Sequence, residues 1–519
     1  MRPSFNTSGP CVPGKHYLLS PEPRFRGVMR LIDEEKYFTL HAGRQTGKST
    51  ASRWLVDWYN AGNTYRALWV DLQSAREKSK VGAAMVEILQ CFTDSVEELD
   101  GLLQAPTREQ RTEMLQTPSH AVLLWLRQVA SQCSKPLVVL IDEADSLVGP
   151  AMVSFLTQIR AGYTRRSKVP FPHSVALIGQ RQVRDYVFSQ KDRRAVAWLG
   201  TTSPFNITAE AATLRAFTKE DVFELLLQHT TQTGQRWEPE AMELIYELSQ
   251  GHPWLVNAMA DQVVNRDVED RAVTVTADHV EAAKETIILA RRSHVDSLAA
   301  RLHEDRVRRV IEPMLAGGRA IGDTLNDDFS YVMGLGLIAN IDGEHQIANS
   351  IYREIIPRVL SYDQQVQITH KTHWYVRADG TLDLRKLLEG WQVFWREDGH
   401  LATEGFSYKE CGPHLMLMAF LQRLVNGGGR IAREYGLGRG ALDLLVTWQG
   451  ERHAIEVKLR RDTETEARAL EQVARYLDTL GEPSGWLVMF DLRKTASWDE
   501  KLFVREVEHG GKRIWIVGC

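Results

Sequence analysis

The stretch His-Ala-Gly-Arg-Gln-Thr-Gly-Lys-Ser-Thr, residues 41–50, decides the fold of the N-terminal part of this chain. It overlaps the end of the apolar segment 37–42 and leads into residues 49–60, where large apolar side chains recur four positions apart. A short apolar run bounded by turn residues is typical of a buried strand, and the four-residue spacing is typical of a helix. The stretch therefore predicts a strand, a glycine-containing loop and a helix in succession.

Three further apolar runs follow along the chain, at residues 66–72, 136–145 and 174–179. They are rich in leucine and β-branched residues, as expected for parallel strands that are covered on both faces. Amphipathic segments of helical character separate them. Regular alternation of strands and helices predicts an α/β fold with a doubly wound parallel sheet.

The loop after the first strand has the composition of a phosphate-binding loop, with Ala42 at the position of the usual first glycine. Backbone N–H groups of such a loop wrap a polyphosphate, so bulky side chains are excluded near Gly47. Lys48 would reach the β- and γ-phosphates, and the Ser49 hydroxyl would bind Mg²⁺. We therefore predict binding of ATP and Mg²⁺, with contacts from Gly43, Thr46, Gly47, Lys48, Ser49 and Thr50.

An acidic pair, Asp142 and Glu143, follows the buried aliphatic run of the third strand. Ligands of α/β sheets bind in the crevice at the carboxyl ends of the strands, which is where this pair would lie. Asp142 would hold Mg²⁺ through water, and Glu143 would polarise the water that attacks the γ-phosphate. The alternative is a pair of acids that stabilise a helix N-terminus.

Two more segments complete a pattern: Gly179-Gln180-Arg181 after the fourth strand, and Gly251-His252-Pro253 between two helices. Together with the loop and the acidic strand, they resemble the AAA-like ATPases of the archaeal-ATPase, origin-recognition and STAND group. This resemblance implies that Arg181 senses the γ-phosphate and that Pro253, in a helical lid, contacts the nucleotide. A surface arginine and a plain helix–helix turn are the alternatives for these two positions.

The middle of the chain changes to helical periodicity from Thr218 to about residue 292, and Thr218 begins a capping-box-like sequence. Residues 300–360 indicate helices followed by a hairpin with Asp342-Gly343 as its turn. That order suits a winged helix, and a plain helical subdomain is the alternative.

The last hundred residues return to strands in quick succession, with one long helix from about residue 464 to 480. Asp443 lies in one strand, and Glu456 and Lys458 lie in the next, with Gln449-Gly450 as the turn between them. Side chains two apart point to the same face of a strand, so the three groups converge. Burying two carboxylates beside a lysine is costly, and bound Mg²⁺ would give them a use in activating water.

This constellation resembles the core of PD-(D/E)XK nucleases, specifically the RecB-like type. The resemblance implies that Asp443, Glu456 and Lys458 are catalytic and that Asp443 and Glu456 bind the metal. It also implies that Gln472 and Tyr476 face the substrate, and that Glu410 is an additional acidic residue. Basic residues near the three central positions would contact nucleic-acid phosphates, and we name Arg439 and Arg460. The alternatives are an inactive nucleic-acid-binding domain and a surface hairpin with ordinary ion pairs.

Composition excludes several classes of protein. The 519 residues are 43% hydrophobic and 25% charged, with a net charge of -4, which excludes a collagen-like, disordered or membrane-embedded chain. Five scattered cysteines form no CxxC pair, and sixteen histidines show no zinc-binding spacing, so we predict a cytoplasmic protein without zinc or contact with a membrane. The domain boundaries that we expect are 1–215 for the ATPase core, 216–294 for the helical lid, 295–362 for the winged helix, 363–402 for a connector and 403–519 for the nuclease-like domain.

Two metal–phosphate sites in one chain predict a sensor joined to an effector. We expect an ATP-binding and ATP-hydrolysing switch that controls a Mg²⁺-dependent nuclease, in defence against foreign DNA or in DNA repair. Its partners would be DNA, or alternatively RNA, and further copies of the chain after ATP binding. The alternatives are an ATP-dependent scaffold that only grips nucleic acid and a motor that moves DNA.

Overall fold

The computed structural model describes most of the chain. The described residues are 3–41, 43, 45–76, 78–179, 208–289, 300–315, 327–341, 343–360, 374–396, 413–414, 416–418, 420–421, 429–437, 440–460, 464–491, 493 and 496–519. The chain divides into two compact units, one of Met1–Ala290 with Ser330–Ile338 and one of Arg291–Phe329 with Ala339–Cys519. None of the helices in the described part of the chain has the length and apolar character needed to cross a membrane.

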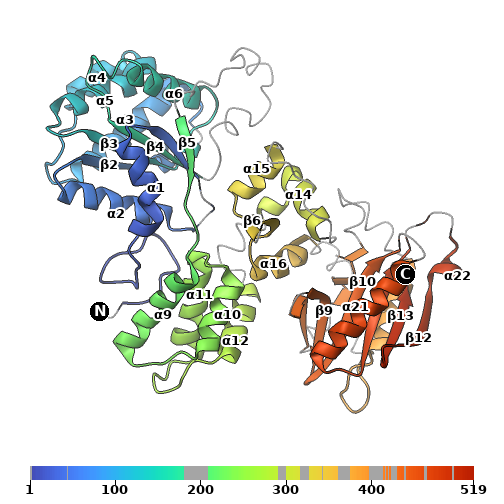
Figure 1. Ribbon diagram of the computed structural model, residues 1–519. Helices are drawn as coiled ribbons and strands as arrows, with labels where there is room; N and C mark the ends of the chain where they lie inside the picture. Colours follow the sequence, from blue (N-terminus) through green and yellow to red (C-terminus); the bar gives the residue numbers. More distant parts are fainter. Residues whose placement is uncertain are drawn as a thin grey trace. The chain divides into compact units, whose positions relative to one another are not determined.

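The first unit is built on a five-stranded sheet in the order β2-β3-β4-β1-β5 (Figure 1). Every neighbouring pair in it is parallel. The strands are β1 (Tyr37–His41), β2 (Arg66–Asp71), β3 (Leu137–Asp142), β4 (Ser174–Gly179) and β5 (Thr208–Thr213). The predicted α/β fold with a parallel sheet is therefore confirmed for this unit.

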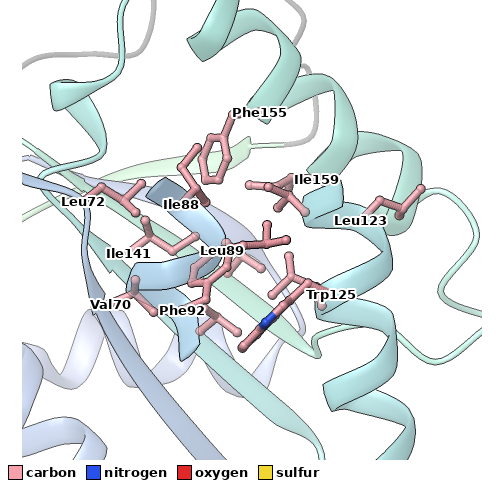
Figure 2. Packing of buried hydrophobic residues seen from close by; sticks show 14 of the residues in the cluster. Val70, Leu72, Ile88, Leu89, Phe92, Leu123, Trp125, Ile141, Phe155 and Ile159 are labelled. Carbon is pink, nitrogen blue, oxygen red and sulfur yellow. The ribbon is translucent and has the colours of Figure 1, made fainter. Parts of the chain in front are cut away.

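Helices cover both faces of this sheet because alternate strand residues point to opposite sides. On one face, Phe38 and Leu40 pack with α1 and α2. On the other, Val70 and Ile141 pack with α3, α5 and α6, as Figure 2 shows. These helices are α1 (Glu22–Asp33), α2 (Lys48–Ala61), α3 (Val81–Glu97), α5 (Ala121–Gln132) and α6 (Gly149–Tyr163), and α4 (Arg108–Leu115) packs beside α5. Each large aliphatic or aromatic side chain buried here contributes about 1.5–3 kcal/mol to folding.

A helical part follows in the same unit. It contains α9 (Lys219–Thr233), α10 (Pro239–Ser249), α11 (Pro253–Gln262) and α12 (Ala277–Leu289). Thr218 caps α9 in a full capping box with Asp221. The N-terminal segment packs on these helices, since the Tyr17 hydroxyl donates to Gln232 at 2.6 Å and lies 3.2 Å from Nδ1 of His229.

The second unit begins with two helices, a hairpin and a further helix, and the winged helix stays a prediction. These elements are α14 (Asp305–Leu315), α15 (Asp327–Gly334, shared between the two units), the paired strands β6 (Ile338–Ile341) and β7 (Glu344–Ile347), and α16 (Ser350–Leu360). In the predicted turn, Gly343 has a φ of 85°, which suits glycine, and Asp342 lies outside the described residues. Arg306 and Arg309 both pair with Asp328.

The rest of the second unit is a six-stranded sheet in the order β12-β13-β11-β10-β9-β8. Strands β8, β9 and β10 pair antiparallel, while β10, β11 and β13 pair parallel. The strands are β8 (Arg430–Leu437), β9 (Gly440–Trp448), β10 (Glu451–Leu459), β11 (Ser484–Phe490), β12 (Phe503–His509) and β13 (Lys512–Gly518). Helix α21 (Thr465–Leu480) makes the crossover from β10 to β11 and packs on the sheet through Val473, Leu477, Leu487 and Ile516.

Candidate functional site

In the loop between β1 and α2, the described residues include a glycine whose backbone suits phosphate binding. Gly47 has a φ of 87°, a conformation that glycine adopts without strain, and it directly precedes α2. The Lys48 ammonium group donates to the Gly43 carbonyl at 2.8 Å, and the Thr46 hydroxyl donates to the same oxygen at 2.9 Å. The lysine is therefore held against the loop at the N-terminus of α2, where the helix dipole attracts anions.

Ser49 and Asp142 meet at the carboxyl edge of the sheet. The Ser49 hydroxyl donates to Oδ2 of Asp142 at 2.7 Å, and the Glu143 backbone N–H donates to Oδ1 at 3.0 Å. Burial raises the pKa of Asp142, while the bond from Ser49 and the charge of Lys48 act in the opposite direction. A hydroxyl and a carboxylate in contact are oxygen ligands of the kind that Mg²⁺ prefers, so these residues fit the predicted ion.

Glu143 is held by a residue that sequence reasoning missed. Its Oε2 lies 3.5 Å from Nη2 of Arg76, which follows the end of β2. Burial raises the pKa of Glu143, and the neighbouring Asp145 and Asp142 raise it further. The sequence signal was a basic residue five positions after the end of β2, the strand next to β3, which is a weak pattern on its own.

Arg24 on α1 is a second missed residue. Its Nη2 donates to the Thr46 carbonyl of the loop at 2.9 Å, and its Nε donates to the Arg215 carbonyl at 2.9 Å. Its guanidinium group also lies over the ring of Phe217, 4.8 Å from the centroid. Burial, together with the charge of Arg215, lowers the pKa of Arg24 to about 10.

The turn before α11 is joined to Arg24 through Phe217. The Phe217 backbone N–H donates to the Gly251 carbonyl at 2.9 Å. Gly251 has a φ of 69°, and a Cβ there would lie 1.9 Å from the Phe217 carbonyl oxygen, so only glycine fits. Pro253 is buried at the first position of α11. The predicted nucleotide contact of Pro253 stays a prediction, and Arg181 lies outside the described residues.

In the second unit, the hairpin of β9 and β10 brings Asp443, Glu456 and Lys458 together as the sequence predicted. Its two turn residues, Gln449 and Gly450, have φ values of 47° and 88°, which match a two-residue hairpin turn. Oδ2 of Asp443 accepts the Val457 N–H at 2.7 Å. Nζ of Lys458 donates to Oε1 of Glu456 at 2.5 Å and lies 3.9 Å from Oδ2 of Asp443.

The charges of Asp443, Glu456 and Lys458 act on one another. Glu456 is fully buried, and burial together with the negative charge of Asp443 raises its pKa to about 7. Burial acts to lower the pKa of Lys458, but Asp443 and Glu456 outweigh it and hold that pKa above its usual value. Lys458 is therefore a cation and a donor in this arrangement. Two neighbouring carboxylates repel each other when both are ionised, and a bound divalent cation removes that repulsion. The donor set therefore fits Mg²⁺.

The predicted substrate-facing pair on α21 is in mutual contact. Nε2 of Gln472 donates to the Tyr476 hydroxyl at 2.8 Å. Tyr476 is close enough to Lys458 to raise the pKa of the lysine. The ring of Tyr476 is buried in the core between α21 and the sheet, whereas Gln472 is half-buried. Of the other predicted residues, Arg460 lies just after β10, while Arg439 and Glu410 lie outside the described residues.

The parallel sheet, the loop before α2 and the Ser49–Asp142 contact define the fold of a P-loop ATPase. The chain belongs to the AAA-like domain family, which matches residues 27–313, more than half of its length. Residues 386–494 match a second family, described as a domain of unknown function (DUF8371). No curated protein matches the chain.

Several solved structures are similar to part of the chain. The Walker-type ATPase of Pyrococcus abyssi is 13% identical, with a TM-score of 0.48, over 68% of this chain and 99% of that one. Cdc6p of Pyrobaculum aerophilum is 12% identical, with a TM-score of 0.34, over 66% of this chain and 94% of that one. The RuvB Holliday junction branch migration motor of Thermotoga maritima is 12% identical, with a TM-score of 0.32, over 64% of this chain and 94% of that one.

Proposed function

We propose that the protein is an ATP-binding and ATP-hydrolysing switch that controls a Mg²⁺-dependent DNA nuclease in its second unit. The observation that carries the proposal is the convergence of Asp443, Glu456 and Lys458 in a chain that also has the Ser49–Asp142 contact beside a phosphate-binding loop. Both arrangements suit a divalent cation next to a phosphate. We propose that the protein acts in DNA repair or in defence against foreign DNA, because a nuclease has to be controlled in both processes.

In the ATPase unit, Lys48 would bind the terminal phosphates, and Ser49 with Asp142 would hold Mg²⁺. Bound Mg²⁺ supplies positive charge that neutralises the phosphate oxygens during transfer to water. Glu143 would orient that water, since its raised pKa makes it a better proton acceptor than an ordinary carboxylate. Arg76 lies 3.5 Å from Glu143 and offsets part of its charge. We also propose that copies of the chain associate when they bind ATP.

In the second unit, Asp443 and Glu456 would hold Mg²⁺ beside a phosphodiester. Bound Mg²⁺ supplies a water of lowered pKa and stabilises the developing charge. Lys458 is a cation here, so it would orient the water and the phosphate by donating hydrogen bonds rather than take a proton. The order of three antiparallel strands, a crossover helix and a parallel strand supports a nuclease core of the PD-(D/E)XK type.

The test compares cleavage of circular and linear DNA in Mg²⁺ with no nucleotide, with ATP and with a non-hydrolysable analogue. We expect cleavage that depends on nucleotide and is lost in Lys458→Ala. Glu143→Gln should abolish ATP turnover while ATP still binds, and sedimentation with and without ATP tests association. Cleavage that persists in Lys458→Ala would contradict the assigned site, and RNA in place of DNA tests the other substrate.

A scaffold that grips nucleic acid without cutting it is the second candidate. The contact of Lys458 with both carboxylates favours it, because the three groups satisfy one another as an internal ion cluster. A scaffold would show ATP turnover and DNA binding with no cleavage in any nucleotide state, and Lys458→Ala would leave its DNA affinity nearly unchanged.

A further inference from the structure

A second charged cluster lies just beyond the ends of β10 and β11. It consists of Asp491, Arg460 and Arg493. Asp491 has a side chain that is only 5% exposed, and Arg493 donates to both of its oxygens, from Nη2 at 2.6 Å and from Nε at 2.9 and 3.0 Å. Nη1 of Arg460 lies 3.9 Å from the same carboxylate. The hydrogen bonds from Arg493 hold the pKa of Asp491 below its usual range, so it is a carboxylate at neutral pH.

The register of the sheet relates this cluster to the acidic site. Lys458 pairs with Met489 across β10 and β11, and the Arg460 N–H donates to the Phe490 carbonyl at 2.8 Å, so the pairing continues to Arg460 and Asp491. Side chains two positions apart share a face, which places Arg460 on the same side as Lys458. The separation along the strand is about 6.6 Å at about 3.3 Å per residue. That distance is close to one step between neighbouring phosphates of a nucleic-acid strand.

The charge and exposure of the cluster fit a phosphate. Two guanidinium groups face the carboxylate of Asp491, and Glu500 also acts on Arg493, so Arg460 at 3.9 Å is the less neutralised of the two. The side chains of Arg460 and Arg493 are 37% and 55% exposed, whereas the carboxylate that fixes them is buried. A guanidinium group has five N–H donors in a planar fork, and a bidentate contact with one carboxylate leaves donors for a second anion. A backbone phosphate matches that remaining fork.

We propose that Arg460 and Arg493 bind the backbone phosphate one nucleotide away from the phosphodiester held at Asp443, Glu456 and Lys458. Arg493 is then a substrate-binding residue that sequence reasoning missed, and Asp491 is a positioning residue that fixes both guanidinium groups. The proposal rests on the proposed nuclease function, because it names where the strand of that same site continues.

The experiment measures DNA binding rather than cleavage. Full-length protein carrying Lys458→Ala is titrated with a fluorescent DNA oligonucleotide, without divalent cations, at several salt concentrations. The slope of log K against log salt reports the number of phosphate contacts, at about 0.9 per contact for duplex and about 0.7 for a single strand. Adding the Arg493→Gln substitution to this protein should weaken DNA binding and reduce the slope by about one contact.

Two further variants separate substrate binding from a structural role. Asp491→Asn keeps both arginines charged and removes the negative charge that offsets one of them, so the slope should not fall as it does in Arg493→Gln. Arg452→Gln is the matched control, since Arg452 is on the same strand at its other end and pairs with Glu482 at 2.7 Å. It should change neither affinity nor slope, and unfolding by circular dichroism verifies that each variant is folded.

The outcomes distinguish this proposal from the proposed function. If Arg493→Gln retains the slope of the Arg452→Gln control, the phosphate contact is wrong. If the slope falls as expected but the wild-type protein cleaves DNA in no nucleotide state, the contact stands and the nuclease assignment is wrong. If the Lys458→Ala protein does not bind DNA or RNA at all, the phosphate contact is overturned, while cleavage by the wild type decides the nuclease assignment.

Discussion

The hydroxyl of Ser49 donates a 2.7 Å hydrogen bond to Oδ2 of Asp142, a residue 93 positions further along the chain. The bond joins the first turn of α2 to the end of β3. It therefore brings into contact the two side chains that the sequence assigned to the same magnesium ion from two separate motifs.

Ser49→Ala should remove the benefit that Mg²⁺ gives to ATP binding. A hydrogen bond to a charged group contributes about 1.5–3 kcal/mol, so we expect affinity for ATP in Mg²⁺ to fall about tenfold or more. Titration with a fluorescent ATP analogue, with and without Mg²⁺, measures this. Ser52→Ala on the same helix is the control, because the described residues give the buried Ser52 hydroxyl no hydrogen-bond partner. Equal enhancement by Mg²⁺ in Ser49→Ala and the control would contradict the assignment.

Arg24→Gln should weaken the coupling between ATP binding and the stability of the first unit. The substitution removes the donors to the Thr46 and Arg215 carbonyls, so the loop and the segment before α9 lose their common anchor. We expect ATP affinity to fall about tenfold and the rise in Tm with ATP to shrink accordingly. Arg26→Gln, at an exposed position on the same helix, should behave as wild type. A full ATP-induced rise in Arg24→Gln would refute the role of Arg24.

Divalent cations should stabilise the second unit through Asp443. A cation that binds only the folded state raises stability in proportion to the logarithm of its concentration above Kd. We therefore expect Mn²⁺ or Mg²⁺ to raise the melting temperature of the wild type by a few degrees and to have no such effect on Asp443→Asn. Asp478→Asn on α21 is the control, since Asp478 is exposed and pairs with Lys512. An unchanged cation effect in Asp443→Asn would exclude this metal site.

His229 should make the stability of the helical part of the first unit depend on pH. Burial holds the pKa of His229 below its usual value of about 6.5, and the charge of Arg271 adds to the effect. The folded state thus favours neutral His229, so its contribution is present above that usual value and is lost as the pH falls through the lower folded value. Calorimetry should show a smaller acid-induced fall in Tm for His229→Gln than for wild type. Equal falls in the Tm of the two proteins would show that His229 does not contribute to the pH dependence of stability.

Much of both sites could be predicted because the relevant contacts are local or follow from strand order. The helix over residues 49–60 is observed as α2 (Lys48–Ala61), and the hairpin with Gln449-Gly450 as its turn has the predicted register. A strand–loop–helix and a two-residue hairpin each carry their geometry in a few adjacent residues. The position of Asp443 beside Glu456 follows from that hairpin alone.

The contacts that sequence reasoning missed depend on distant packing. Arg24 reaches a carbonyl 191 positions away, and no periodicity in the sequence relates α1 to that segment. Arg76 acts through an ion pair with Glu143 that forms only after β2 and β3 are aligned. Strand β5 was missed because its sequence, Thr-Ala-Glu-Ala-Ala-Thr, is rich in residues of low strand propensity and pairs with β1 through the tertiary fold.

The hairpin of β9 and β10 has a consequence for how the molecule assembles. The contact between Asp443 and Val457 spans 14 residues, whereas Ser49 and Asp142 are 93 residues apart. Short loops close at a lower entropy cost, so in a refolding chain the acidic hairpin is expected to form before the nucleotide site. Synthesis on the ribosome reverses that order, because every described nucleotide-site residue emerges before Asp443 is made. A newly made molecule therefore acquires its nucleotide site before its acidic hairpin.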